Sequence, residues 1–247
     1  PICAARFFAL LPAQDSGPIT LSRTHYWRGR AAEALGNSVA MRAGYQAAAR
    51  YPTAYYGQLA LARLGRDGVE LHAPSPAANA DSMAADERVR AADMLYTIGE
   101  PDIVLYFAAD LAEESPDVGM LEALGELTGR RNDARAMLQI GKIALARGFA
   151  FDHYAFPVIG IPRHSPIAPD IGRSMTYSIA RTESAFDQRD KSAANAVGLM
   201  QVMPETWAAL RARHDLGTDP FDPRDNILAG AAYLREMHDR YGTVAGM

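Results

Sequence analysis

The chain has 247 residues, of which 49% are hydrophobic and 22% are charged. This composition is typical of a globular protein and excludes a disordered chain. With 25 Lys and Arg against 29 Asp and Glu, the net charge is −4, so we expect no surface-wide basic field for nucleic acid. A single cysteine, Cys3, excludes an internal disulfide framework and any metal site built from several cysteines.

Neither a membrane span nor a targeting segment is visible in the sequence. No stretch approaches 18 consecutive apolar residues, so no transmembrane segment is predicted. The chain opens on Pro1 without an initiator Met or a charged segment before an apolar run, and it stops at Met247. We expect both ends to be cuts through a longer protein.

Residues 20–148 are rich in helix-forming Ala, Leu, Arg, Glu and Met and lack alternating β-branched runs. Glycines end the apolar-periodic stretches at Gly36, Gly65, Gly99 and Gly129, which follow one another at intervals of 29, 34 and 30 residues. Such periods are typical of paired helices stacked in a solenoid. The sequence therefore predicts a superhelical region of helix hairpins over residues 1–150, with an irregular helical bundle as the alternative.

One sequence feature predicts a helix start within this region, and another predicts that helical structure is interrupted after it. Ser115 followed by Pro116 predicts a helix start, because Ser is a good N-cap and Pro suits the first helical position. Residues 151–173 contain four prolines, which exclude a continuous helix. The aromatic residues beside those prolines predict a strap that lies on the protein surface, and the domain junction is placed here.

Residues 174–247 return to helical periodicity. Met175, Ile179, Ala180 and Glu183 fall at i, i+4, i+5 and i+8, on one face of a helix. A second helix is predicted from Pro204. A third is predicted between an Asp222 N-cap and Gly242, with Pro223 at its first position.

Glu183 is the candidate for chemistry, because it shares its helix face with apolar side chains. A carboxyl group on such a face is expected to lose hydration, which favours its protonated form. A protonated carboxyl group can donate a proton to a leaving oxygen. The alternative is an ordinary Glu at a helix end, solvated or paired with Arg181 or Lys191.

The sequence around Glu183 resembles a known family. The string at residues 179–186 is Ile-Ala-Arg-Thr-Glu-Ser-Ala-Phe, and Gln201 of a Gly198-Leu199-Met200-Gln201 signature follows Glu183 after 18 positions. Later come Asp-Pro at 222–223, Asn-Ile at 226–227 and the stretch 230–234. Together these motifs resemble the soluble lytic transglycosylase family, whose catalytic domain is lysozyme-like. The resemblance covers residues 174–247 and extends more loosely over the helical part, at 26–31 and 51–57.

This resemblance implies an all-α fold: a superhelical helix-hairpin region at 1–150, a strap at 151–173 and a lysozyme-like catalytic domain at 174–247. It also implies that this domain is truncated at its C-terminus. The family carries an Ala-Tyr-Asn-Ala-Gly motif soon after the third helix, and the chain stops before it. A second departure is Asn195, where the family often has Gly. Asn tolerates the left-handed conformation best after Gly, so we expect little effect.

The same resemblance implies cleavage of the β-1,4 bond between N-acetylmuramic acid and N-acetylglucosamine in peptidoglycan, with formation of a 1,6-anhydro sugar. Glu183 would be the single acid and base. The implied substrate-binding residues are Ser184, Gly198, Leu199, Met200 and Gln201. The nearby acids Asp187, Asp190 and Glu205 are assigned structural roles. The implied location is the bacterial envelope, periplasmic where there is an outer membrane, with peptidoglycan strands and cell-wall proteins as partners.

Two alternatives stay open at this point. One is a muramidase, a hydrolase on the same fold that positions a water molecule. The other is a helical scaffold or glycan-binding protein whose catalytic domain is vestigial. The six histidines are scattered without ligand spacing and no phosphate-binding loop is present, so we expect neither a metal nor a cofactor.

Overall fold

The computed structural model describes residues 17–66, 68–69, 71, 86–164 and 171–242. These residues form α-helices joined by turns, without any strand. Two isolated bridges, Lys191 with Val197 and Val197 with Val202, tie one turn-rich segment together. The predicted all-α fold class is confirmed. No helix of the described part is long and apolar enough to cross a membrane.

The first helices are α2 (Pro18–Ala34), α3 (Ser38–Ala48) and α4 (Tyr55–Arg63), and α2 packs against both others. Glycines permit the close contact between α2 and α3, since a Cβ at Gly44 would lie 2.6 Å from the backbone nitrogen of Gly29. A small core of Tyr26, Tyr45 and alanines fills the space between the three helices.

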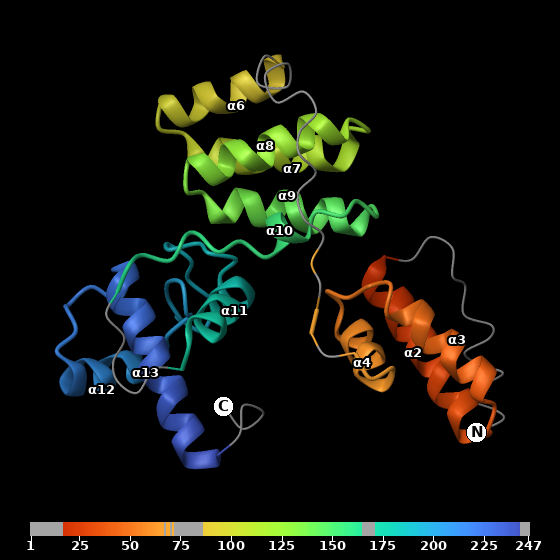
Figure 1. Ribbon diagram of the computed structural model, residues 1–247. Coiled ribbons are helices and arrows are strands. Elements are labelled where there is room, and N and C mark those ends of the chain that lie inside the picture. The colour runs from red at the N-terminus through yellow and green to blue at the C-terminus, as the bar shows by residue number, and fades with distance from the viewer. Residues whose placement is uncertain (1–16, 67, 70, 72–85, 165–170, 243–247) are drawn as a thin grey trace.

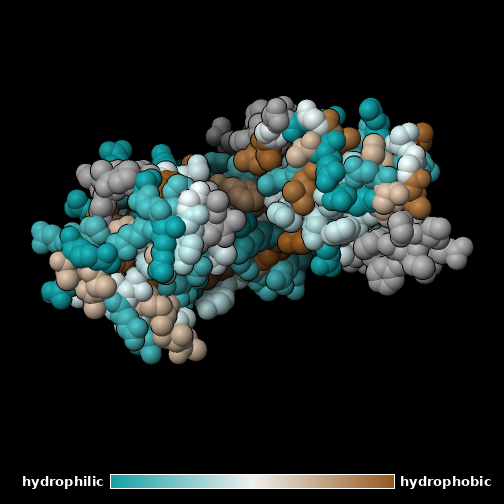
Figure 2. Space-filling model, turned by 90° about the horizontal axis from the view of Figure 1, so that it is seen from below, coloured by the Kyte–Doolittle hydropathy of each residue, from teal (hydrophilic) through white to brown (hydrophobic). Residues whose placement is uncertain are grey.

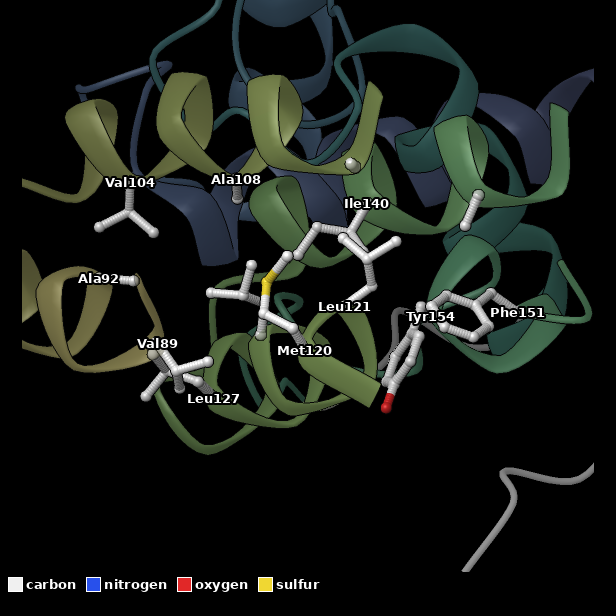
Figure 3. Close-up of a cluster of buried hydrophobic side chains, with 13 residues drawn as sticks. Val89, Ala92, Val104, Ala108, Met120, Leu121, Leu127, Ile140, Phe151 and Tyr154 are labelled. Atoms are coloured by element: carbon white, nitrogen blue, oxygen red, sulfur yellow. The ribbon is translucent and has the colours of Figure 1, made fainter. Parts of the chain in front are cut away.

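The next four helices form the stack at the top of Figure 1. They are α6 (Glu87–Thr97), α7 (Pro101–Glu114), α8 (Val118–Arg130) and α9 (Ala134–Ala146). Their core contains Leu121, Leu124 and Ile140 and is shown in Figure 3. The caps are aspartates in three of the four helices, and Asp117, not Ser115, caps α8 by accepting a hydrogen bond from the Met120 N–H. The expected helix start at Ser115-Pro116 is therefore wrong by two residues.

The segment after α9 differs from the expected surface strap. It contains the short α10 (Asp152–Ala155), whose Tyr154 is 1% exposed. Tyr154 and Phe151 belong to the core of the stack, and their rings lie next to each other in Figure 3. A glycine makes room for Tyr154 in this core, since a Cβ at Gly125 would lie 2.6 Å from the Tyr154 ring. The absence of a continuous helix was predicted correctly, and residues 165–170 lie outside the described part.

The last helices are α11 (Arg173–Glu183), α12 (Pro204–His214) and α13 (Pro223–Tyr241). Their core contains Leu199, Leu210 and Ile227, all 0% exposed, and it extends to Leu138 of α9. The predicted Asp222 cap of α13 is confirmed, since its carboxylate accepts from two backbone N–H groups. Seen from below, the molecule has two lobes with a recess between them (Figure 2). The division into domains at residues 151 and 174 stays a prediction.

Candidate active site

A pocket of about 450 Å³ lies among α11, α12, α13 and the turn that precedes α12. The three helices are grouped at the lower left of Figure 1. Most of the pocket wall is apolar, and among its lining residues Glu183 is the one ionisable carboxyl group. The residues that line the pocket are Met175, Ile179, Glu183, Met200, Gln201, Val202, Met203, Thr206, Gly230, Tyr233 and Leu234.

Glu183 is the last residue of α11. Met175 and Ile179 precede it by two turns and one turn on the same helix face, and all three line the pocket. The side chain of Glu183 is exposed, which corrects the expectation that this carboxyl group is buried. The apolar stripe of α11 is a pocket wall at this end of the helix, so water reaches the carboxyl group in the free protein.

The turn at residues 198–201 contributes Met200 and Gln201 to the pocket wall. It begins at Gly198, whose φ of +74° lies in the left-handed region that favours glycine. Gln201 also has a positive φ, and its side-chain amide donates to the backbone carbonyls of Gly198 and Asp190 at 3.1 and 3.3 Å. These contacts fold the turn back on itself and fix the side of Gln201 that faces the pocket.

Ser184 connects this turn to the end of α11. Its hydroxyl group is buried and lies 2.9 Å from the carbonyl oxygen of Leu199 and 3.1 Å from that of Ala180. Because Ser184 directly follows Glu183, the hydrogen bond to Leu199 ties the end of α11 to the turn that carries Met200 and Gln201.

Comparison with known proteins shows which family this site resembles. Residues 168–246 match the family model described as the transglycosylase SLT domain. This stretch contains α11, α12, α13 and the whole pocket. Residues 168–246 therefore resemble transglycosylase SLT domains, and below we call this matched stretch the SLT domain.

Curated relatives agree with the family match over the same part of the chain. A transglycosylase of Enterobacteria phage PRD1 is 46% identical over 70 residues, which are 28% of this chain and 24% of the relative. A putative soluble lytic murein transglycosylase of Haemophilus influenzae is 38% identical over 76 residues, which are 29% of this chain and 13% of the relative. The chain thus matches less than a quarter of either relative's length.

The likeness to solved structures is longer and concerns the fold. An inactive Glu-to-Gln mutant of the lytic transglycosylase Slt from Pseudomonas aeruginosa matches 96% of this chain and 39% of its own chain, with a TM-score of 0.69 at 24% identity. The superhelical and lysozyme-like arrangement expected from the sequence is therefore confirmed, and so is the resemblance to the soluble lytic transglycosylase family.

The SLT domain brings together three of the six residues expected at its site. Glu183, Met200 and Gln201 line the pocket. Ser184, Gly198 and Leu199 lie behind the wall, where Leu199 is 0% exposed and Ser184 is 8% exposed. Asn195 has a φ of +67°, which is the left-handed conformation that Asn tolerates best after Gly.

Several pocket residues of the SLT domain were not expected from the sequence. Tyr233 and Gly230 come from α13, and Thr206 comes from the first turn of α12. Gly230 and Tyr233 are three residues apart and so share a helix face. That spacing could have indicated a common surface, but periodicity does not show which helix faces the pocket.

The other acids near Glu183 have contacts of their own. Asp187 forms an ion pair with Arg135 of α9 at 2.9 Å. Asp190 offers its backbone carbonyl to Gly198 and Gln201. Glu205 lies in the first turn of α12, where a carboxylate suits the positive end of a helix. Within the described residues there is no group of three or more His, Cys, Asp or Glu that could hold a metal ion.

Proposed function

We propose that the SLT domain cleaves the β-1,4 bond between N-acetylmuramic acid and N-acetylglucosamine in peptidoglycan and forms a 1,6-anhydro product. The observation that carries the proposal is the pocket itself: an apolar hollow in an SLT domain with Glu183 as the one carboxyl group among its described lining residues. The Haemophilus relative is described as a putative murein transglycosylase, and the inactive Pseudomonas mutant exchanges Glu for Gln.

In the proposed reaction, Glu183 acts first as an acid and then as a base. Its protonated carboxyl group donates the proton to the glycosidic oxygen as the bond from that oxygen to C1 of the muramoyl sugar breaks. The carboxylate then accepts the proton of the muramoyl C6 hydroxyl as O6 bonds to C1. The proton is returned to Glu183, and no water is consumed.

The presence of one carboxyl group favours this route over hydrolysis. Glycosidases of the ordinary kind use two carboxyl groups, the second of which activates water or forms a covalent adduct. When the nucleophile is a hydroxyl group of the sugar, the second carboxyl group is not needed. Asp187 is the acid that follows Glu183 most closely in the sequence. It is paired with Arg135 and does not line the pocket.

The proposed roles of the other expected residues follow from their contacts. Gln201 uses its amide N–H groups on backbone carbonyls, so its side-chain oxygen is the part that can accept a hydrogen bond from a sugar hydroxyl or acetamido group. Met200 offers an adaptable apolar surface to a pyranose face. Ser184, Gly198 and Leu199 act on the substrate through the shape of the turn, since they do not line the pocket.

The test is mass spectrometry of purified peptidoglycan incubated with the longest available form of the protein that contains this chain. Products lighter by one water than reducing muropeptides support the proposal. Reducing-end products would show a hydrolase instead, and no release from the intact protein would favour a binding role.

Two variants sharpen this test. Glu183→Gln should lower the rate by roughly 10²- to 10⁴-fold, the usual contribution of a positioned acid or base. Glu205→Gln is the matched control, because Glu205 is an exposed carboxylate of the same domain that does not line the pocket. Equal loss in both variants would contradict the role assigned to Glu183.

We also propose that the protein works in the bacterial envelope, with peptidoglycan strands at the pocket and cell-wall proteins on the helical region. The Haemophilus relative, which is described as a putative soluble lytic murein transglycosylase, supports peptidoglycan strands as the partner at the pocket. Fractionation of cells that express the full-length protein tests the location, and recovery of the protein from the cytosol alone would contradict it.

A further inference from the structure

We propose that Asn226 is a positioning residue that holds the pocket wall at Met200 and Gln201 in register with Glu183. The inference rests on the proposed function in so far as it concerns turnover. Asn226 lies on α13, one turn before Gly230 of the pocket wall, and does not line the pocket itself. Its role is therefore exerted through the turn at residues 198–201.

The side chain of Asn226 is 0% exposed and its amide is fully engaged. Its Oδ1 accepts a hydrogen bond from the Met200 N–H at 2.8 Å. Its Nδ2 donates to the carbonyl oxygens of Val197 and Pro220, both at 2.9 Å. One side chain thus satisfies a backbone group just before the turn, one within the turn and one on the loop before α13.

The turn also presses directly against this amide. A Cβ at position 198 would lie 2.6 Å from Nδ2 and 2.7 Å from Cγ of Asn226. Gly198 therefore serves two needs at once, its positive φ and the close approach to Asn226. The turn has no room to shift toward α13, and its hydrogen bonds to Asn226 prevent a shift away from it.

The turn is held from its other side by Ser184. The Ser184 hydroxyl bonds to the carbonyl of Leu199, and Asn226 bonds to the N–H of the next residue, Met200. The peptide group between Leu199 and Met200 is therefore fixed at both its oxygen and its nitrogen, by two different elements. Ser184 follows Glu183 directly, so this peptide group links the end of α11 to the part of the pocket wall that Met200 and Gln201 form.

A purely structural role for Asn226 would reduce stability and leave the folded molecules equally active. A positioning role predicts a further effect, because small displacements of groups around a reacting bond reduce turnover disproportionately. The two roles are separated by measurements on the folded population alone.

The main variant is Asn226→Leu, which has a similar volume and removes all three hydrogen bonds. Amide hydrogen exchange followed by NMR reports directly on the Met200 N–H. We expect its exchange to accelerate roughly tenfold or more, the usual consequence of losing the partner of a buried donor. We expect kcat of the folded protein to fall by at least a similar factor, with a smaller change in KM.

The matched control is Leu138→Ala, which removes a buried side chain of the same hydrophobic cluster from α9. This variant should destabilise the protein. The rate at which the Met200 N–H exchanges through local opening should stay within about twofold of wild type, and so should kcat of the folded protein. If Asn226→Leu does not fold, Asn226→Asp replaces it. That variant keeps an acceptor for Met200 and loses the amide donor to Val197 and Pro220, and its kcat should also fall.

Unchanged Met200 exchange in Asn226→Leu, or an unchanged kcat in either Asn226 variant, would overturn the positioning role. Failure of the proposed function looks different. In that case the wild-type protein releases no anhydro product, and the Met200 exchange rate still decides whether Asn226 holds the turn.

Discussion

The contact between Gly230 and Met200 gives a sharp test of how the pocket is built. Gly230 lies on α13, and a Cβ there would be 2.6 Å from Cβ and 2.7 Å from Cγ of Met200. Ordinary contacts of a Cβ begin at 3.4 Å, so Gly230→Ala requires a displacement of about 0.8 Å. The clash is with atoms near the Met200 backbone, so a rotation of the side-chain tip cannot relieve it.

Two effects of Gly230→Ala on stability oppose each other. Overpacking of this kind costs about 1–3 kcal/mol. Alanine gains about 1 kcal/mol over glycine inside a helix. The free energy of unfolding should therefore fall by about 0–2 kcal/mol. The effect on turnover should be larger, since a displacement on the scale of 1 Å near a reacting bond can reduce the rate by roughly 100-fold.

Urea unfolding followed by the fluorescence of Trp207 measures the stability of this part of the protein, because Trp207 belongs to the same core as Met200. The chain has two tryptophans, so each variant is made in a Trp27→Phe protein, in which Trp207 is the one remaining tryptophan. Release of anhydro products measures turnover.

The control for this substitution is Gly129→Ala on α8. A Cβ there meets only the end of the Met137 side chain, at 3.0 Å. It should stabilise α8 by up to about 1 kcal/mol and leave turnover unchanged. If Gly230→Ala were as stable and as active as the Gly129→Ala control, the close packing of α13 on the pocket turn would be refuted.

Three other predictions follow from particular contacts. Leu124→Ala should lower the free energy of unfolding by about 2–5 kcal/mol, because Leu124 is 0% exposed in the core of the stack; calorimetry of the variant checks this, and a loss below about 1 kcal/mol would contradict the packing. The hydrogen bonds from Arg88 lower the pKa of Asp86 from 3.8 to about 2, so the stability that the ionised carboxylate contributes is present above pH 3.8 and is lost as the pH falls through 2. Asp86→Ala should therefore flatten the acid limb of stability measured by urea titration, and an unchanged limb would contradict the assignment. Carbodiimide should label Glu183 in the free protein as readily as the exposed Glu205, and a bound glycan fragment should protect Glu183 alone; a Glu183 that resists labelling without ligand would show that it is buried.

The helix positions were predictable because they depend on local chemistry. Gly36, Gly65 and Gly99 each have a positive φ after a helix, which few other residues adopt. Asp222 was predictable as a cap for the same reason, since the cap depends on residues within one turn. Ser115 was misread because it and Asp117 are both good caps two positions apart, and local propensity does not rank them.

The start of the strap, at residues 151–155, was misread because burial depends on partners far away in the sequence. Tyr154 enters the core through the space left by Gly125 and Gly141, and a Cβ at Gly141 would lie 2.2 Å from the backbone nitrogen of Ala155. Nothing near residue 154 in the sequence shows these glycines. The proline content correctly excluded a long helix, but it does not indicate whether the side chains of the segment are buried in the core or exposed on the surface.

Glu183 shows the same limit at the site. An apolar stripe on a helix indicates a surface that avoids water, and both a core and a groove for a sugar have such surfaces. The carboxyl group at the end of the α11 stripe is exposed in the free protein, so its dehydration has to come from the substrate. A glycan strand that fills the pocket would bring its own apolar ring faces against Met200 and Ile179 and displace the water around Glu183. The carboxyl group of Glu183 would then be in low-dielectric surroundings only while a substrate is bound. The open pocket of the free protein is therefore compatible with the proposed acid–base role of Glu183.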